Sequence, residues 1–118
     1  MQTILILTKD LMMQSSASAA ARDAGYRLRA CGSVGRLTER LVEEAPIAGI
    51  FVDLQTPELS MEELAQALDI DQAPSTIAFA QHVEEELLAN AKIDCIDAIL
   101  TRGQFSRELP ALVGKLSG

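Results

Sequence analysis

The sequence has very few aromatic residues, which make up 3% of its 118 residues and include no Trp. A folded core must therefore come from Ile, Leu, Val, Ala and Met, and an apolar content of 48% is sufficient for one. A chain of this length forms one compact core and leaves no room for a second. We expect a single domain over residues 1–118.

The chain also lacks a cysteine pattern and a long apolar run. Its two cysteines, Cys31 and Cys95, are far apart and match neither a disulfide framework nor a metal motif. Reduced thiols are typical of cytoplasmic proteins, and we expect that location. The apolar run at residues 4–7 has no basic residue before it, which indicates a first strand instead of a signal peptide. No stretch approaches the length of a membrane span, so no membrane partner is expected.

Positive charge is scarce: 10 Lys and Arg stand against 17 Asp and Glu, for a net charge of −7. Binding to nucleic acid depends on clustered Lys and Arg. Here the basic residues are scattered along the sequence, and Arg27 with Arg29 is the nearest approach to a cluster. Direct binding to nucleic acid is therefore not expected.

Motifs of common catalytic and nucleotide sites are missing as well. The first predicted strand-to-helix turn, at residues 8–12, has no glycine, which argues against a glycine-rich phosphate loop. The single histidine, His82, has no Ser or Cys partner at a recognisable spacing and is expected in a loop. We therefore expect no catalytic residue, no enzyme activity and no bound cofactor.

What the sequence does contain is an alternation of short apolar runs and helical patterns. Short apolar runs predict strands at residues 3–7, 48–52, 76–80 and 98–101, and the run at 3–7 is typical of a parallel strand buried on both faces. Residues 26–31 also predict a strand, in which the alternating Arg27 and Arg29 indicate an edge position. Helical spacing predicts helices at residues 11–24, from Val34 to before Pro46, from Ser60 through Leu68, at residues 84–91, and around Leu109 to Leu116. Gly25 predicts the end of the first helix, and Ser60 with Glu63 three residues later predicts a capping box at the start of the third. Five strand–helix repeats imply a doubly wound α/β domain, with a five-stranded parallel sheet and helices on both faces.

The carboxyl ends of parallel strands form the functional edge of such a sheet. Asp53 follows the third and most apolar strand, and it is the most informative residue of the chain. The other residues delivered to this edge are Thr8, Lys9 and Asp10 after the first strand, Ala80 after the fourth and Arg102 after the fifth. They predict a pocket in which cations flank the Asp53 carboxylate. Asp53 could instead cap its own turn, and Asp10 could cap the first helix.

Over its whole length the chain resembles the receiver domains of bacterial response regulators, which have a flavodoxin-like fold. The matching parts are the first strand, the helix end Gly25-Tyr26, Asp53 followed four residues later by Pro57, and residues 97–102. In that family the residue at the position of Asp53 accepts a phosphoryl group from a histidine kinase. The resemblance implies a signalling module of the two-component or phosphorelay type.

Four features of the family's phosphorylation pocket are changed in this sequence. Thr8 and Lys9 replace the acidic pair that helps to bind Mg²⁺, Phe79 or Ala80 replaces a Ser or Thr, Arg102 replaces a Lys, and Met61 replaces a Gly. A Lys in the metal shell opposes Mg²⁺, and its ammonium beside Asp53 would take the place of the metal. We expect a degenerate pocket, as in a pseudo-receiver, that holds no metal and stays in one state.

Two alternatives stay open. A working single-domain receiver would be phosphorylated on Asp53 and would hold Mg²⁺ with Asp10 and Asp53. A flavodoxin-like domain that binds a small ligand, or a small enzyme, would use the same crevice.

The expected partner is another protein, or a histidine kinase, because the chain leaves no room for an output domain. In receivers the usual partner or dimer surface is built from the fourth helix, the fifth strand and the fifth helix, so a homodimer is possible. The residues that this region supplies here are Leu87, Leu88, Ile99, Phe105 and Arg107, and we expect several of them to serve the core as well.

Overall fold

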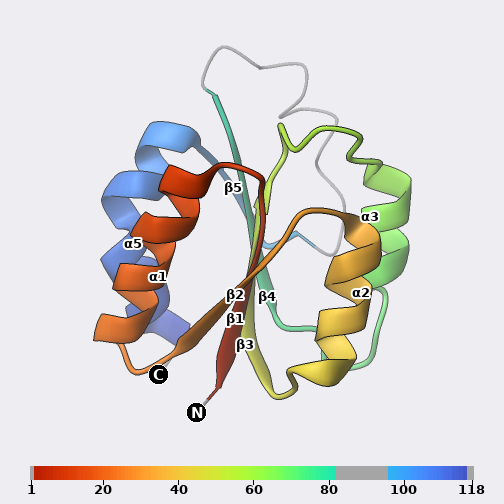
Figure 1. The fold of residues 1–118 in the computed structure, drawn as a ribbon, viewed down its shortest axis with the longest axis horizontal. Coiled ribbons are helices and arrows are strands. Elements are labelled where there is room, and N and C mark those ends of the chain that lie inside the picture. The colour runs from red at the N-terminus through yellow and green to blue at the C-terminus, as the bar shows by residue number, and fades with distance from the viewer. Residues whose placement is uncertain (1, 82–95, 117–118) are drawn as a thin grey trace.

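A parallel sheet of five strands forms the centre of the protein in a computed structural model that describes residues 2–81 and 96–116. The strands are β1 (Thr3–Leu7), β2 (Arg27–Cys31), β3 (Ile47–Asp53), β4 (Ser75–Ala80) and β5 (Ala98–Thr101). Their order across the sheet is β2-β1-β3-β4-β5 (Figure 1). This is the strand order of the flavodoxin-like doubly wound fold.

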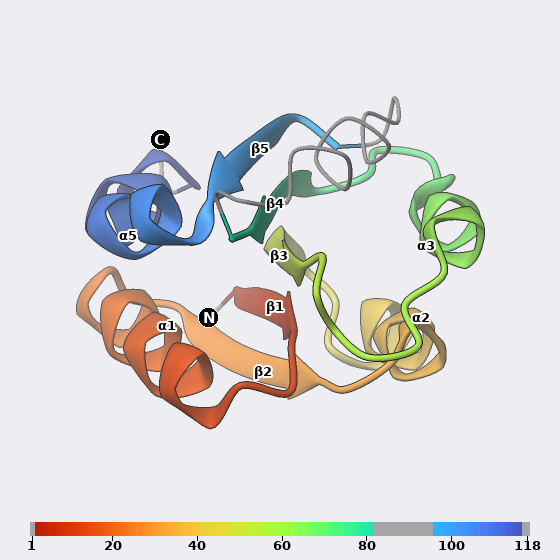
Figure 2. The same ribbon diagram turned by 90° about the horizontal axis from the view of Figure 1, so that it is seen from above.

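Helices cover both faces of the sheet, as Figures 1 and 2 show. One face carries α1 (Leu11–Asp23) and α5 (Arg102–Leu116), and the other carries α2 (Val34–Glu43) and α3 (Met61–Leu68). Because the sheet is covered on both sides, β1 is buried along its whole length. Burial on both faces of the sheet explains the run of apolar residues at 4–7.

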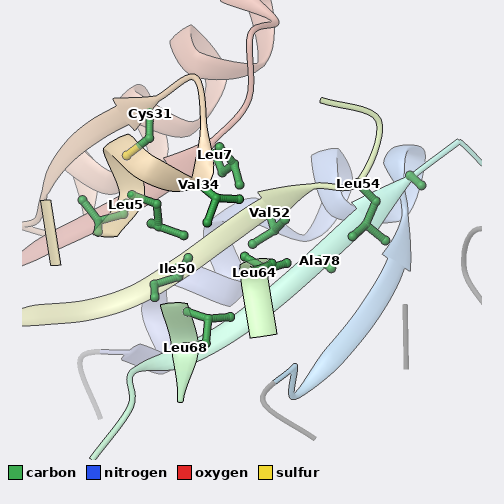
Figure 3. Packing of buried hydrophobic residues seen from close by; sticks show 12 residues of the cluster. Leu5, Leu7, Cys31, Val34, Ile50, Val52, Leu54, Leu64, Leu68 and Ala78 are labelled. Atoms are coloured by element: carbon green, nitrogen blue, oxygen red, sulfur yellow. The ribbon is translucent and has the colours of Figure 1, made fainter. Parts of the chain in front are cut away.

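Each face of the sheet has its own apolar core. Leu5, Val52 and Leu64 belong to the core under α2 and α3 (Figure 3). The other core lies under α1 and α5 and contains three stacked or edge-on aromatic rings. Phe105 stacks on Phe79 with ring centroids 4.1 Å apart, and it meets Phe51 edge-on at 5.0 Å. The few aromatic residues are thus gathered at the base of α5.

Local sequence signals account for the start of α3 and the end of α1. Ser60 accepts a hydrogen bond from the Glu63 N–H, as the predicted cap of α3 requires. Gly25 has a positive φ of 86° after α1. The Gly25 N–H donates to the Arg22 carbonyl and the next N–H donates to the Ala21 carbonyl, which is the glycine-dependent helix end that the sequence predicts.

The predicted fold class is confirmed, with differences at the ends of elements. Predicted and observed strands differ by one residue at most at either end. The last helix begins at Arg102, well before the leucines that predicted it. The predicted helix at 84–91, His82 and Cys95 lie outside the described residues. Among the described helices, none is both long enough and apolar enough to cross a membrane.

The structure shows which residues of the predicted interaction face serve the core. Phe105 is fully buried in the core under α5, so it cannot serve as surface. Ile99 is half-buried and packs against the other core. Arg107 is exposed on α5, whereas Leu87 and Leu88 lie outside the described residues. The α-helical spacing from Phe105 to Leu109 and Leu112 explains why Phe105 faces inward.

Candidate functional site

The carboxyl ends of β1, β3, β4 and β5 meet at one edge of the sheet and border a pocket of about 330 Å³. The residues that line this pocket are Lys9, Asp10, Asp53, Gln55, Thr56, Pro57, Gln81 and Arg102. Thr8 and Ala80 are buried beside it. The structure therefore brings the predicted site residues together at this edge.

Asp53 ends β3 and is 5% exposed, so its charge depends on nearby donors. One carboxylate oxygen, Oδ1, accepts from the backbone N–H of Gln55 at 3.0 Å. The other, Oδ2, accepts from the Thr8 hydroxyl at 2.7 Å and from Arg102 Nη1 at 3.4 Å. Both oxygens are thus engaged within the protein, and the Gln55 bond is the turn-capping contact that the sequence left open.

Asp10 has two functions at the start of α1. Its Oδ1 accepts from the backbone N–H groups of Met12 and Met13, at 2.9 and 3.1 Å, so Asp10 caps the helix. Its Oδ2 accepts from Arg102 Nη2. The same carboxylate therefore caps a helix and forms an ion pair across the pocket.

Arg102 is held at the pocket by the way in which α5 begins. Thr101 is the last residue of β5 and Arg102 the first of α5, with no loop between them. The Thr101 Oγ1 accepts from the Gln104 N–H at 3.1 Å, and the Gln104 side-chain carbonyl accepts from the Thr101 N–H at 2.9 Å. This reciprocal pair is a capping box. The guanidinium also lies 5.8 Å from the Phe79 ring centroid, within the range of a cation–π contact.

Lys9 does not make the contact with Asp53 that the sequence suggested. Among the described residues, no carboxylate lies within ion-pair distance of its ammonium, and Lys9 is exposed. Its side chain runs past Gly32, where a Cβ would lie 3.5 Å from Lys9 Cε. Thr8, the preceding residue, faces Asp53 instead. Arg102 supplies the cation that we had expected from Lys9.

Gln55 is a pocket residue that the sequence reasoning missed. Its side-chain carbonyl accepts from the Gln81 N–H at 2.9 Å and so joins the turn after β3 to the end of β4. Phe79 and Ala80, the two candidates for the position where receivers have a Ser or Thr, are both fully buried, and neither has a side-chain hydroxyl to offer. No local sequence motif predicts the Gln55 contact, because it joins residues that are 26 positions apart.

The residues at this edge do not fit the Mg²⁺ ion that the receiver resemblance implies. Mg²⁺ needs near-octahedral oxygen ligands. The Arg102 guanidinium contacts both carboxylates of the pocket, and the exposed Lys9 adds a second positive charge to its lining. In the described part of the chain, no group of three His, Cys, Asp or Glu residues is placed to hold a metal. We call Arg102, Asp10 and Asp53 the pocket cluster.

β2 lies at one edge of the sheet (Figure 2), and two of its arginines belong to a second charged cluster. The Glu44 carboxylate contacts three arginines, Arg29 and Arg40 at 3.3 Å and Arg27 at 3.9 Å. The basic residues are therefore less scattered than the sequence suggested, because the fold brings β2 and the end of α2 together. We call these four residues the edge cluster.

Cys31 is buried next to the edge cluster and is a free thiol. Burial raises the pKa of Cys31 from 9.0 to about 11, and the nearby charges of Arg40 and Arg36 act in the opposite direction. Cys31 is therefore a protonated, packed thiol at neutral pH.

Comparison with known proteins gives a match by structure and none by sequence. No family model matches the chain, and no curated protein matches it either. A response regulator receiver domain protein from Clostridium thermocellum has a TM-score of 0.78 and 15% identity, with 98% of this chain and 94% of that chain covered. A CheY-like receiver domain protein from Methanospirillum hungatei JF-1 has a TM-score of 0.74 and 20% identity, covering 99% and 94%.

A third similar structure is the chemotaxis response regulator CheY4 of Vibrio cholerae, with a TM-score of 0.77 and 14% identity. The match covers 98% of both chains. Identities this low carry no information about pocket chemistry, but the likeness extends over nearly the whole of each chain. The protein has the fold of the response regulator receiver domains.

Proposed function

We propose that this protein is a receiver-like module of two-component signalling that acts through protein–protein contacts and not as an enzyme. The receiver fold supports the signalling class. The observation that supports the finer claim is the occupation of Asp53: backbone, hydroxyl and guanidinium donors engage both of its carboxylate oxygens. In this proposal the pocket is degenerate, and Asp53 anchors structure instead of accepting phosphate.

The chemistry of phosphoryl transfer explains why this occupation matters. Transfer depends on positioning and on neutralisation of charge on the phosphoryl oxygens, in which metal ions have the main part. An attacking carboxylate oxygen also has to be free to approach phosphorus. Here Oδ2 of Asp53 is shared between Thr8 and Arg102, and the residues of the edge do not fit Mg²⁺.

The proposed partners are proteins of two-component systems, among them a histidine kinase that could dock without transferring phosphate. The exposed side of α5 around Arg107 belongs to the face that such partners would use, and a homodimer through this face is part of the proposal. The cytoplasmic location remains a prediction from the sequence.

The test is the mass of the intact protein after incubation with acetyl phosphate and Mg²⁺. We expect no addition of a phosphoryl group to the wild type, as for the Asp53→Asn variant. A known CheY-type receiver serves as the positive control. Stoichiometric modification of the wild type that disappears in Asp53→Asn would establish the working receiver instead and refute the degenerate pocket.

A further inference from the structure

We infer that Arg102 is a resident cation: its guanidinium takes the place that a divalent metal would need between Asp10 and Asp53, and its removal opens a metal site there. This inference rests on the proposed function and states how the pocket is kept in one state. It concerns a site that the native protein keeps closed.

The first argument is the geometry of the guanidinium. Nη1 contacts Asp53 Oδ2 and Nη2 contacts Asp10 Oδ2, so the two ends of one planar group join two carboxylates. Such a fork holds its donors at fixed spacing, which a Lys ammonium cannot do. The charge is also permanent, because an Arg side chain does not deprotonate in proteins. A divalent ion would have to displace this group and bear its repulsion.

The second argument is that neighbouring residues restrict the position of the Arg102 side chain. The capping box of Thr101 and Gln104 fixes the first turn of α5, which begins at Arg102 itself. The guanidinium lies over Phe79, and Phe79 stacks on Phe105 in the core. These contacts limit the positions that the side chain can take, so the metal would also have to move a supported group.

The third argument is what remains when the guanidinium is gone. Asp53 keeps its bonds from Thr8 and Gln55, and Asp10 remains fixed as the cap of α1. The two Oδ2 atoms that shared Arg102 would then face one pocket whose remaining cation, the exposed Lys9, forms an ion pair with neither of them. Two preplaced carboxylate oxygens and water are a ligand set that Mg²⁺ and Mn²⁺ accept.

The experiment is a Mn²⁺ titration followed by amide NMR, with Arg102→Gln as the main variant and Arg107→Gln as a matched control on the exposed side of α5. We expect paramagnetic broadening of the Lys9 and Gln55 amide signals in Arg102→Gln, at a Mn²⁺ concentration roughly tenfold below any effect on wild type or Arg107→Gln. Arg102→Met, which keeps an apolar stem beside Phe79, serves if the Gln variant does not fold. Thr101→Ala tests the positioning by the capping box and should give broadening between wild type and Arg102→Gln.

Two outcomes would overturn the inference. One is equal broadening of these signals in wild type and Arg102→Gln. The other is no broadening in a variant whose remaining spectrum shows a native fold. No phosphodonor is present, so the result is separate from the test of the proposed function: a wild type that binds Mn²⁺ but resists acetyl phosphate would refute the resident cation alone.

Discussion

The pocket cluster and the edge cluster have opposite ratios of charge. In the pocket, one guanidinium contacts two carboxylates, whereas at the edge of β2 three guanidiniums contact one carboxylate. The two clusters also differ in burial. The contrast lies in their extreme members: the side chain of Asp53 is 7% exposed, while those of Arg27 and Arg29 are 46% and 42% exposed. The other charged groups of both clusters lie between 18% and 37%.

This difference in burial decides what each ion pair contributes. A buried carboxylate that loses its cation stays away from water, so breaking the pair costs several kcal/mol. An exposed guanidinium that loses its carboxylate is solvated at once, and its pair contributes little. The surplus of carboxylates in the pocket thus makes the single cation critical, whereas at the edge the exposed Arg27 and Arg29 are dispensable.

The largest effect is expected for Arg102→Ala. We expect the free energy of unfolding to fall by about 2–3 kcal/mol, because the variant leaves Asp53 buried with hydroxyl and amide donors only. Urea unfolding of the two proteins measures this. The double variant with Arg102→Ala and Asp53→Asn should recover part of the lost stability, since it removes the unpaired carboxylate charge. If Arg102→Ala lowers the free energy of unfolding by less than the loss of a surface ion pair does, the proposed difference between the two clusters is wrong.

A smaller effect is expected for Glu44→Ala, which leaves the three arginines of the edge cluster close together. Glu44 is 18% exposed, and we expect a loss of about 1–2 kcal/mol that shrinks in high salt as the repulsion is screened. The loss for Arg102→Ala should depend less on salt. Arg36→Ala, which breaks an exposed pair with Glu39, is the control and should cost less than about 0.5 kcal/mol. Equal salt dependence of the Glu44 and Arg102 variants would contradict the argument from burial.

The smallest effect concerns Cys31 and appears only at high pH. Because its pKa is about 11 in the folded protein and 9.0 ordinarily, the folded state holds the proton more tightly. Its contribution is complete below pH 9 and is lost as the pH rises towards 11. At pH 10 the wild type should have lost about 1 kcal/mol that Cys31→Ala does not lose. If the free energies of unfolding of the two proteins change in parallel between pH 8 and 10, the nearby arginine charges outweigh the effect of burial on the pKa of Cys31.

The sequence predicts the fold well because each signal behind it is local. Runs such as residues 3–7 are apolar throughout only when both faces of a strand are buried, and Gly25 ends a helix by its own φ. The same holds for Ser60 and Asp10 as caps, since their partners lie within three residues.

The pocket is harder to predict because it depends on directions and on register. Neighbouring residues in extended chain point to opposite sides, so the choice between Thr8 and Lys9 as the partner of Asp53 cannot be made from composition. The edge cluster joins positions 27, 29, 40 and 44, which meet only when the sheet and α2 are assembled. One signal was present in the sequence and overlooked: Thr101 followed by Gln104 is a capping-box pattern.

The direct passage from β5 into α5 has a mechanical consequence. With no loop residue between Thr101 and Arg102, no flexible joint can absorb a movement of the helix relative to the strand. A shift or rotation of the first turn of α5 therefore carries the guanidinium with it and alters its distance to both carboxylates. Binding of a partner to the first turn of α5 would therefore act directly on the contacts of Arg102 with Asp10 and Asp53.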